Sequence, residues 1–418
     1  MAKHIWMIAY TNYSIDARVR REAEAIASLP EYRVHLLALK EMKEPRSYVL
    51  DGVEVHELNV AKYRGGGNFK YLSSYMRFLI LAFLKCSRLS LKGAIDLIHV
   101  HNMPNFLVFA AILPRCFGKK IVLDVHDTLI ETYASKFNGI FSKLLNVALV
   151  LEEFVCCKLA HKVICVNETQ RQALLNRGLS EQKTIVLMNL PDPNRYQLNR
   201  RDCEKCDNAG FRVVYFGTIT RRLGVDIALR AIHEIRSRIP GLHFFIFGDG
   251  DGREECLGIC RQLGMGDIVS FSETAVPLDE LIHKVRGMDL LVVYNRANEA
   301  TQLMLPVKML EGMSMGIPVV APRLRTIEHY FAADQVFYFA SEDVHSLAGA
   351  ILIAYTDGEE RKNKAVNANR FFEKYSWDEQ KTHLFALYSG MVGGGFICLE
   401  IRLVFDEMVL ALLNFRNF

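Results

Sequence analysis

The sequence predicts an α/β protein of two Rossmann-like domains, each a doubly wound parallel sheet covered by helices. Three observations predict this class. Short apolar runs of strand length alternate with amphipathic helical stretches from residue 4 onwards. The alternation stops over residues 191–210 and resumes at Phe211. The chain has 418 residues, which is too long for one compact core and suits two domains of ordinary size.

The first predicted domain covers residues 1–190. It opens with the apolar run 4–9, the loop Tyr10 to Ser14 and a helical stretch over 16–28. Parallel neighbours need a crossover connection, so this β-α-β order indicates a parallel sheet. The other strand-like segments are residues 33–39, 97–101, 120–126, 162–166 and 184–188.

The second predicted domain covers residues 211–375. Before it, residues 191–210 hold two prolines and many charged residues without periodicity, which predicts a linker with an exposed loop. Its strand-like runs are 213–216, 243–247, 268–271, 290–294 and 318–321. Two such domains in tandem place the carboxyl ends of both sheets around one central cleft, where doubly wound sheets bind ligands.

Two further segments follow. Residues 376–390 are predicted to form a closing helix, and residues 391–418 an atypical tail that is apolar but carries several charges. We expect the tail to be a loosely packed or disordered extension, with a membrane-surface helix as the alternative. No apolar run reaches the roughly 18–20 residues of a membrane span.

Charge and cysteine content bear on partners and compartment. The net charge of +4, from 51 basic and 47 acidic residues, excludes a dedicated nucleic-acid binder and weakly favours anionic ligands or an anionic membrane face. The opening residues lack the features of a signal peptide, and most of the ten cysteines lie in apolar runs. We therefore expect a cytoplasmic protein. Cys203 and Cys206 are interpreted as a chance pair, with a zinc site as the alternative.

The most informative segment is Leu305 to Val320. It is interpreted as a loop, a helix opened by Pro306, a stop at Gly316 and a buried strand. The start of such a helix offers free N–H groups and a positive dipole end, which suit a diphosphate. Glu311 can accept hydrogen bonds from two ribose hydroxyls, although spacing alone favours a solvated pair of Glu311 with Lys308.

Two glycine-containing turns follow strands of the second domain. Gly217 permits a close backbone approach to a ligand, and the forks of Arg221 and Arg222 match phosphate oxygens. Gly248 begins a Gly-Asp-Gly-Asp-Gly turn at the same sheet edge. This turn either binds phosphate or only supplies glycines where the backbone needs a positive φ. No Gly-Lys-Ser/Thr follows, which excludes a P-loop.

In this order and spacing, the three segments resemble glycosyltransferase family 4, the retaining enzymes of the GT-B fold. The likeness spans roughly residues 4–390 and includes DARVRREA from Asp16, HVHNMP from His99, LDVHD from Leu123 and FSETAVPLDEL from Phe271. It implies transfer of a sugar from a nucleotide-sugar donor to a glycan or lipid-linked acceptor in cell-surface polysaccharide or glycoconjugate synthesis. It also implies no cofactor and no metal, and we find no convincing Asp-x-Asp pair in a loop.

The resemblance also assigns roles. Glu311 corresponds to the carboxylate that holds the donor ribose, Arg222 to the clamp on the diphosphate, and His126 to a histidine facing the transferred sugar; these are the expected catalytic residues. Without the resemblance, His126 is interpreted as a core histidine. The expected donor-binding residues are Gly217, Arg221, Arg222, Gly248, Val276, Gln302, Leu303, Lys308 and Glu311. The expected acceptor-binding residues are Asn12, Arg18, Asn102 and His126.

Departures from the family pattern leave alternatives open. Leu303 stands where the first carboxylate of the Glu-x7-Glu motif is usual, so the hydroxyl contacts of that carboxylate are either lost or moved to Gln302 or to backbone. The usual clamp lysine falls near Leu223. A non-catalytic nucleotide-sugar binder and a nucleotide-sugar epimerase therefore stay as alternatives. The apolar, basic-flanked segment Phe69 to Leu91 predicts either a docking face for an anionic membrane or an ordinary core helix.

Overall fold

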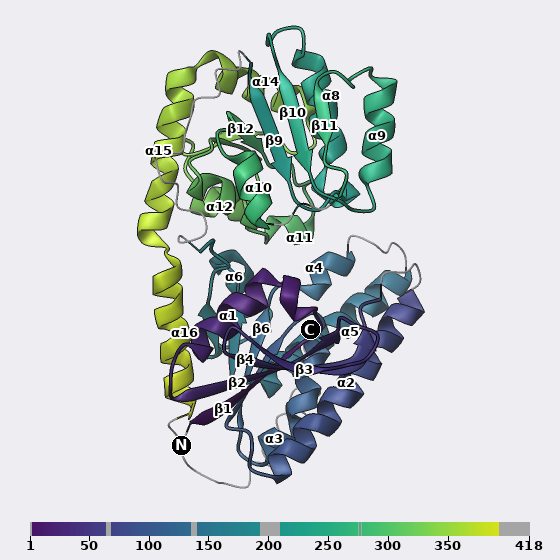
Figure 1. Cartoon of the computed structure of the whole chain (residues 1–418), viewed down its shortest axis with the longest axis vertical. Helices are drawn as coiled ribbons and strands as arrows, with labels where there is room; N and C mark the ends of the chain where they lie inside the picture. Colours follow the sequence, from purple (N-terminus) through teal and green to yellow (C-terminus); the bar gives the residue numbers. More distant parts are fainter. Residues whose placement is uncertain are drawn as a thin grey trace. The chain divides into compact units, whose positions relative to one another are not determined.

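The computed structural model describes residues 2–63, 68–134, 140–192, 210–274, 276 and 278–392. The chain divides into two compact units (Figure 1). The first comprises Met1–Asn189 together with the segment from Asp378, and the second is Leu190–Trp377. Most of the predicted linker, the Cys203/Cys206 pair and the tail beyond Val392 lie outside the described residues.

Within the described residues, the first unit contains an eight-stranded sheet in the order β3-β4-β2-β1-β5-β6-β7-β8. The strands are β1 Lys3–Ala9, β2 Tyr32–Lys40, β3 Ser47–Leu50, β4 Val53–Ala61, β5 Leu97–His101, β6 Lys120–Val125, β7 Lys162–Cys165 and β8 Thr184–Val186. Neighbours pair in parallel except β3 and β4. This hairpin was missed by the sequence analysis, although Asp51 and Gly52 at its turn, both with positive φ, are a typical hairpin signal.

Helices cover both faces of this sheet. They are α1 Ala17–Ala27, α2 Asn68–Leu91, α3 Ile112–Cys116, α4 Leu129–Ala134, α5 Ile140–Leu159, α6 Glu168–Asn176 and α16 Trp377–Val392, with 3-10 turns at Tyr13–Ile15, Asn105–Ala111 and Glu181–Lys183. Successive β1 residues face opposite cores: Met7 packs with Leu384 and Tyr388 of α16, and Ile8 packs with Phe78 of α2. The sheet is therefore buried on both sides, as expected of a parallel sheet.

The second unit contains, in its described part, a six-stranded parallel sheet in the order β11-β10-β9-β12-β13-β14. The strands are β9 Arg212–Phe216, β10 His243–Phe247, β11 Val269–Phe271, β12 Leu290–Val292, β13 Val319–Pro322 and β14 Phe337–Phe339. The helices are α8 Val225–Ile235, α9 Arg253–Gln262, α10 Leu278–Val285, α11 Glu299–Gln302, α12 Val307–Ser314, α13 Arg325–Tyr330, α14 Val344–Thr356 and α15 Gly358–Lys374, with a 3-10 turn at Arg221–Leu223.

The strand orders locate the ligand-binding edges of the two sheets. In the second unit, β10 and β11 lie on one side of β9, and β12 to β14 lie on the other. In the first unit, the order reverses between β1 and β5. Loops that leave the carboxyl ends of strands at such switch points diverge and open a crevice for ligands. The prediction of two doubly wound parallel sheets is confirmed.

Candidate functional site

In the second unit, two glycines bring neighbouring strand ends into close contact. Gly217 follows β9 with φ 118°, and its N–H donates to the carbonyl of Phe247 at 2.9 Å. A Cβ atom on Gly248 would lie only 1.9 Å from the carbonyl oxygen of Gly217. A side chain at position 248 therefore cannot be accommodated without moving backbone. At this edge of the sheet the backbone of both glycines has no side chain over it, which permits close approach of a ligand.

Lys308 reaches this bare edge from the first turn of α12. Its Nζ donates to the hydroxyl of Tyr215 at 2.7 Å and lies 4.1 Å from the centre of that ring. A Cβ on Gly217 would sit 3.1 Å from the same Nζ. Burial lowers the pKa of Lys308 to about 7, opposed by Glu311 and assisted by Arg222. The interpretation of Lys308 as half of a solvated helix pair is therefore wrong.

Glu311 and Arg222 act electrostatically on Lys308, and Arg221 precedes Arg222 in the chain. Glu311 is partly buried one turn further along α12. Arg221 and Arg222 lie exposed in the turn Arg221–Leu223, whose backbone carbonyls accept hydrogen bonds from Arg296 at 3.0 and 3.2 Å. The structure thus brings together the loops after β9 and β10 and the first turns of α12, with cationic side chains next to glycine backbone and the amino end of a helix. Such a group suits an anionic phosphate ligand.

Gln302 and Leu303 lie at the end of α11. The side-chain oxygen of Gln302 accepts a hydrogen bond from the backbone N–H of Arg325 at 2.7 Å, and its carbonyl accepts one from Thr326. Leu303 is buried, with 8% of its surface exposed. Neither residue presents a carboxylate, and the Gln302 acceptor is already engaged.

Val276 lines a cavity of about 620 Å³ beyond β10 and β11, a volume in the range of small-molecule sites. Phe245, Phe247 and Phe271 contribute aromatic surface to its wall. Ser272, also in the wall, accepts a hydrogen bond from the N–H of Gly248 at 3.0 Å, so the cavity adjoins the glycine edge. The sequence analysis missed Phe245 and Phe247, although their spacing of two along a strand places them on one face.

The first unit holds a buried carboxylate, Asp124 at the end of β6. Arg18 donates to its Oδ1 at 2.6 Å, and His101 Nδ1 and His126 Nε2 lie 3.1 and 2.8 Å from its Oδ2. Burial raises the pKa of Asp124, but Arg18 and His126 outweigh this and hold it well below its usual range. An ionised carboxylate only accepts hydrogen bonds, so both ring nitrogens must donate to it. Asp124 therefore fixes the tautomer of His126, with Nδ1 as the acceptor.

Three of the four predicted acceptor-binding residues, Arg18, Asn102 and His126, lie at or next to this carboxylate. Asn102 accepts a hydrogen bond from the N–H of His126 at 2.7 Å and donates to the carbonyl of Asp127 at 2.8 Å. The His126 side chain is 21% exposed, so it lies at the rim of the group rather than in the core. Asn12 lies in the loop that follows β1. Strand β1 pairs with β5, and Asn102 lies in the loop that follows β5. Arg18 is buried and acts on Asp124, which places it behind His126 rather than on a surface.

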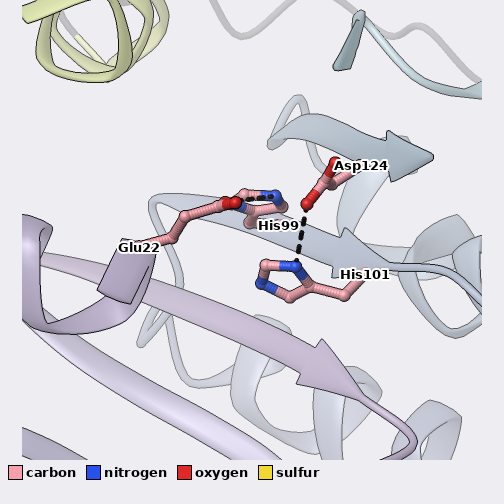
Figure 2. A group of neighbouring side chains, drawn as sticks. All are labelled: Glu22, His99, His101 and Asp124. Carbon is pink, nitrogen blue, oxygen red and sulfur yellow. Dashed lines mark hydrogen bonds and ion pairs between the residues drawn. The ribbon is translucent and has the colours of Figure 1, made fainter. Parts of the chain in front are cut away.

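Glu22, His99, His101 and Asp124 form a fully buried cluster behind His126 (Figure 2). Their possible ligand atoms lie within 4.8 Å of one another, the spacing of a candidate metal site. Arg18, however, contacts both carboxylates, at 3.3 Å for Glu22 and 2.6 Å for Asp124, so a guanidinium already occupies the place of a cation between them. Burial and the charge of Asp124 raise the pKa of Glu22 to about 7, although Arg18 and His101 oppose this. The sequence analysis passed over this cluster, whose signal is the pair of histidines two residues apart on β5.

Comparisons with known proteins agree with this architecture. Residues 15–189 match the family model described as glycosyl transferase 4-like domain, and residues 210–357 match glycosyl transferases group 1. Sucrose-phosphate synthase from Thermosynechococcus elongatus superposes with a TM-score of 0.77 at 17% identity, over 94% of this chain and 100% of that one. HepE from Anabaena, solved with UDP-glucose, superposes with a TM-score of 0.70 at 16% identity, over 93% and 99% of the two chains.

The fold is therefore of the GT-B class. A curated relative, the sulfoquinovosyl transferase SQD2 of Arabidopsis thaliana, is 29% identical over 167 residues, which make up 39% of this chain and 31% of that protein. The chain thus matches less than half of that relative's length. The two matched ranges are separated only by residues 190–209 and together take in most of both units. This chain belongs to the group 1, type-4-like glycosyltransferases, as the resemblance in its motifs predicted.

Proposed function

We propose that this protein transfers a sugar, with retention of anomeric configuration and without a metal, from a nucleotide-sugar donor to a glycan or lipid-linked acceptor. The observation that carries the proposal is the group formed by Lys308, Arg222 and Glu311 beside the bare backbone of Gly217 and Gly248. Family membership supports the reaction class, and the structure of HepE with UDP-glucose illustrates such a donor on a similar fold.

The diphosphate, the ribose and the base of the donor each have a proposed counterpart in the second unit. The diphosphate would contact Arg221, Arg222 and Lys308 together with the amino end of α12. Glu311 would accept hydrogen bonds from the two ribose hydroxyls. The aromatic cavity that includes Val276 would receive the base, since its wall offers both ring faces and polar groups.

The proposed reaction breaks the bond between the anomeric carbon and the phosphate oxygen, and its electron pair goes to the diphosphate. The cations and helix N–H groups stabilise the negative charge that develops there. The acceptor hydroxyl attacks from the same face, and the departing phosphate oxygen takes its proton. His126, held by Asp124, would face the transferred sugar with its Nδ1 lone pair.

We further propose that the acceptor is reached at the inner, cytoplasmic face of a membrane, in cell-surface polysaccharide or glycoconjugate synthesis. Phe78, Ala82 and Cys86 bury one side of α2, while the other side exposes a row of apolar side chains. These are Tyr71, Leu72, Met76, Ile80, Phe83, Leu84 and Leu91. Exposed Lys70, Arg77, Arg88 and Lys92 lie on the same helix or just after it. An apolar face with basic neighbours suits an anionic lipid surface.

This surface would support peripheral contact rather than a crossing. Within the described residues, no helix has both the length and the hydropathy required to traverse a bilayer. The core-helix interpretation of Phe69 to Leu91 accounts for the buried side of α2 and leaves the exposed apolar row unexplained.

The first experiment is thermal unfolding of the purified protein with UDP-, GDP-, dTDP- and ADP-sugars. A ligand at about 100 times its Kd adds about 2.7 kcal/mol to the free energy of unfolding. We expect one nucleotide class to raise the melting temperature, and Glu311→Ala to remove the rise. Transfer to an acceptor, with the product anomer identified by NMR, then tests retention; an inverted product would refute the mechanism above.

Two other functions remain as rivals because Leu303 is buried where relatives of the family usually carry a carboxylate. A non-catalytic nucleotide-sugar binder would show the thermal shift with neither transfer nor hydrolysis of the donor. A nucleotide-sugar epimerase would form the 2-epimer of the donor sugar without an acceptor. Either result would replace the transferase proposal.

A further inference from the structure

A second group of histidines lies on the opposite face of the first unit's sheet from Asp124. His35 on β2 is paired in register with Glu54 on β4, and His56 follows two residues later on the same face of β4. Trp6 on β1 packs against both rings, with centroid distances of 4.4 Å to His35 and 5.2 Å to His56. The pairing of three strands thus collects two imidazoles, a carboxylate and an indole at one place.

The potential ligand atoms of this group face one another. One atom each from His35, Glu54 and His56 lies within 4.8 Å of the other two. His35 Nδ1 is 3.1 Å from Glu54 Oε2 but without the alignment of a hydrogen bond. His35 Nδ1 and His56 Nε2 are both buried and have no hydrogen-bond partner among the described residues. Buried polar atoms are nearly always satisfied, so two such nitrogens beside a carboxylate indicate a missing ligand.

The remaining nitrogen of each ring is held from behind. His35 Nε2 lies 2.9 Å from Nδ1 of His4, and His56 Nδ1 lies 3.2 Å from the hydroxyl of Ser47. In metal sites the nitrogen that does not bind the ion is usually hydrogen-bonded in this way, which orients the ring. Both rings therefore have one supported nitrogen and one directed into the cluster. In contrast with the Asp124 cluster, the described residues place no guanidinium on the Glu54 carboxylate.

We propose that His35, Glu54 and His56 bind a divalent transition-metal ion, Zn²⁺ foremost. Two imidazoles and one carboxylate, with solvent in the fourth position, form a donor set that Zn²⁺ commonly accepts. Zn–N bonds of about 2.0–2.1 Å require the ligand atoms to draw together. The side chain of Glu54, which is 42% exposed, can turn to do this and gives the ion a path from solvent. The bound ion would fasten β4 to β2 near the edge of the sheet.

Trp6 provides a direct test, because Co²⁺, a paramagnetic substitute for Zn²⁺, quenches a nearby indole. The protein used is the untagged full chain with three substitutions. Trp377→Phe leaves Trp6 as the only fluorescent indole, and Cys203→Ser with Cys206→Ser removes the other suspected metal ligands. We expect saturable quenching by one equivalent of Co²⁺, reversed by Zn²⁺. His56→Gln and Glu54→Gln should each weaken Co²⁺ binding more than about 10-fold, and Ser47→Ala by about 10-fold.

His345→Gln is the matched control, since His345 also pairs with a glutamate, Glu234 at 2.8 Å, but on the surface of the second unit. It should leave the quenching curve unchanged. Melting temperatures in EDTA establish that each variant is folded, and Ser47→Ala tests the site without removing a ligand. The proposal is overturned if Trp6 is not quenched, or if His56→Gln and His345→Gln give the same affinity as the parent protein. No sugar substrate is needed, so the result is independent of the proposed transferase activity.

Discussion

Donor binding should weaken steeply as pH rises above neutrality, because Lys308 must be protonated to hold a diphosphate. In the free protein, burial sets the pKa of Lys308 at about 7, so the ammonium is largely lost by pH 9. A bound diphosphate would return its pKa towards or above the ordinary value of 10.5. Binding at pH 8 to 9 must therefore take up a proton, and the cost of that uptake lowers the affinity.

The size of the effect follows from these two pKa values. Between pH 7 and pH 9, the unprotonated fraction of free Lys308 rises from about one half to about 99%, while the bound lysine stays protonated. The apparent Kd should increase about 50-fold, equivalent to about 2 kcal/mol. The diphosphate of a nucleotide-sugar has no group that titrates in this interval, so its own charge does not produce the slope.

Isothermal titration of the preferred donor between pH 6.5 and pH 9.5, in buffers of different ionisation enthalpy, measures both Kd and proton uptake. Lys308→Met should bind weakly at every pH, with a flat profile. It should remain folded at pH 7, because burial disfavours the charged form that the substitution removes. Lys374→Met, at an exposed lysine of α15, should keep the parent profile. A parent Kd that does not change across this range would refute the assignment of Lys308 to the diphosphate.

Four further results are expected. Asp124→Asn removes the shorter of the two ion pairs of Arg18 and should lower the free energy of unfolding by about 3 kcal/mol, measured by urea unfolding. It should also lower kcat by about 100-fold through loss of the His126 tautomer, measured by transfer kinetics. Ile80→Glu with Leu84→Glu should abolish flotation with anionic liposomes. Gly248→Ala should cost about 2–3 kcal/mol or more in urea unfolding, because its Cβ meets the backbone of Gly217. The folded-state pKa of Glu22 is raised, so the contribution of this residue to the free energy of unfolding should be fully present below about pH 4.5 and be lost as pH rises through about 7. In Glu22→Gln, the free energy of unfolding measured against pH should no longer show this decrease.

Matched controls separate these effects from general damage. Gly258→Ala on α9, where an added Cβ meets no atom within 4 Å, should not destabilise the protein. Ile353→Glu introduces one such charge at an apolar side chain of α14 that is 51% exposed, and should leave flotation intact. If Ile353→Glu also abolishes flotation, or if Gly248→Ala melts like the parent, the corresponding assignment fails.

Much of the fold could be predicted from local sequence because strands buried on both faces appear as continuous apolar runs. The runs at 4–9, 33–39 and 213–216 each became a central strand. Three strands were missed: β3 and β4 alternate in burial along the chain instead of forming a continuous apolar run, and β14 has only three residues. The roles of Arg222 and Glu311 came from motif order, and they stay predictions that the donor experiments decide.

The sequence by itself determined the alternation of strands and helices, the glycines that follow β9 and β10, and the helix that starts after Pro306. These are properties of neighbouring residues: hydrophobic period, backbone freedom and capping. Only the tertiary structure decided that Asp124 contacts Arg18, and that His35 meets Glu54 and His56. Such contacts depend on strand order and register, which bring together residues far apart in the chain and which no local pattern specifies.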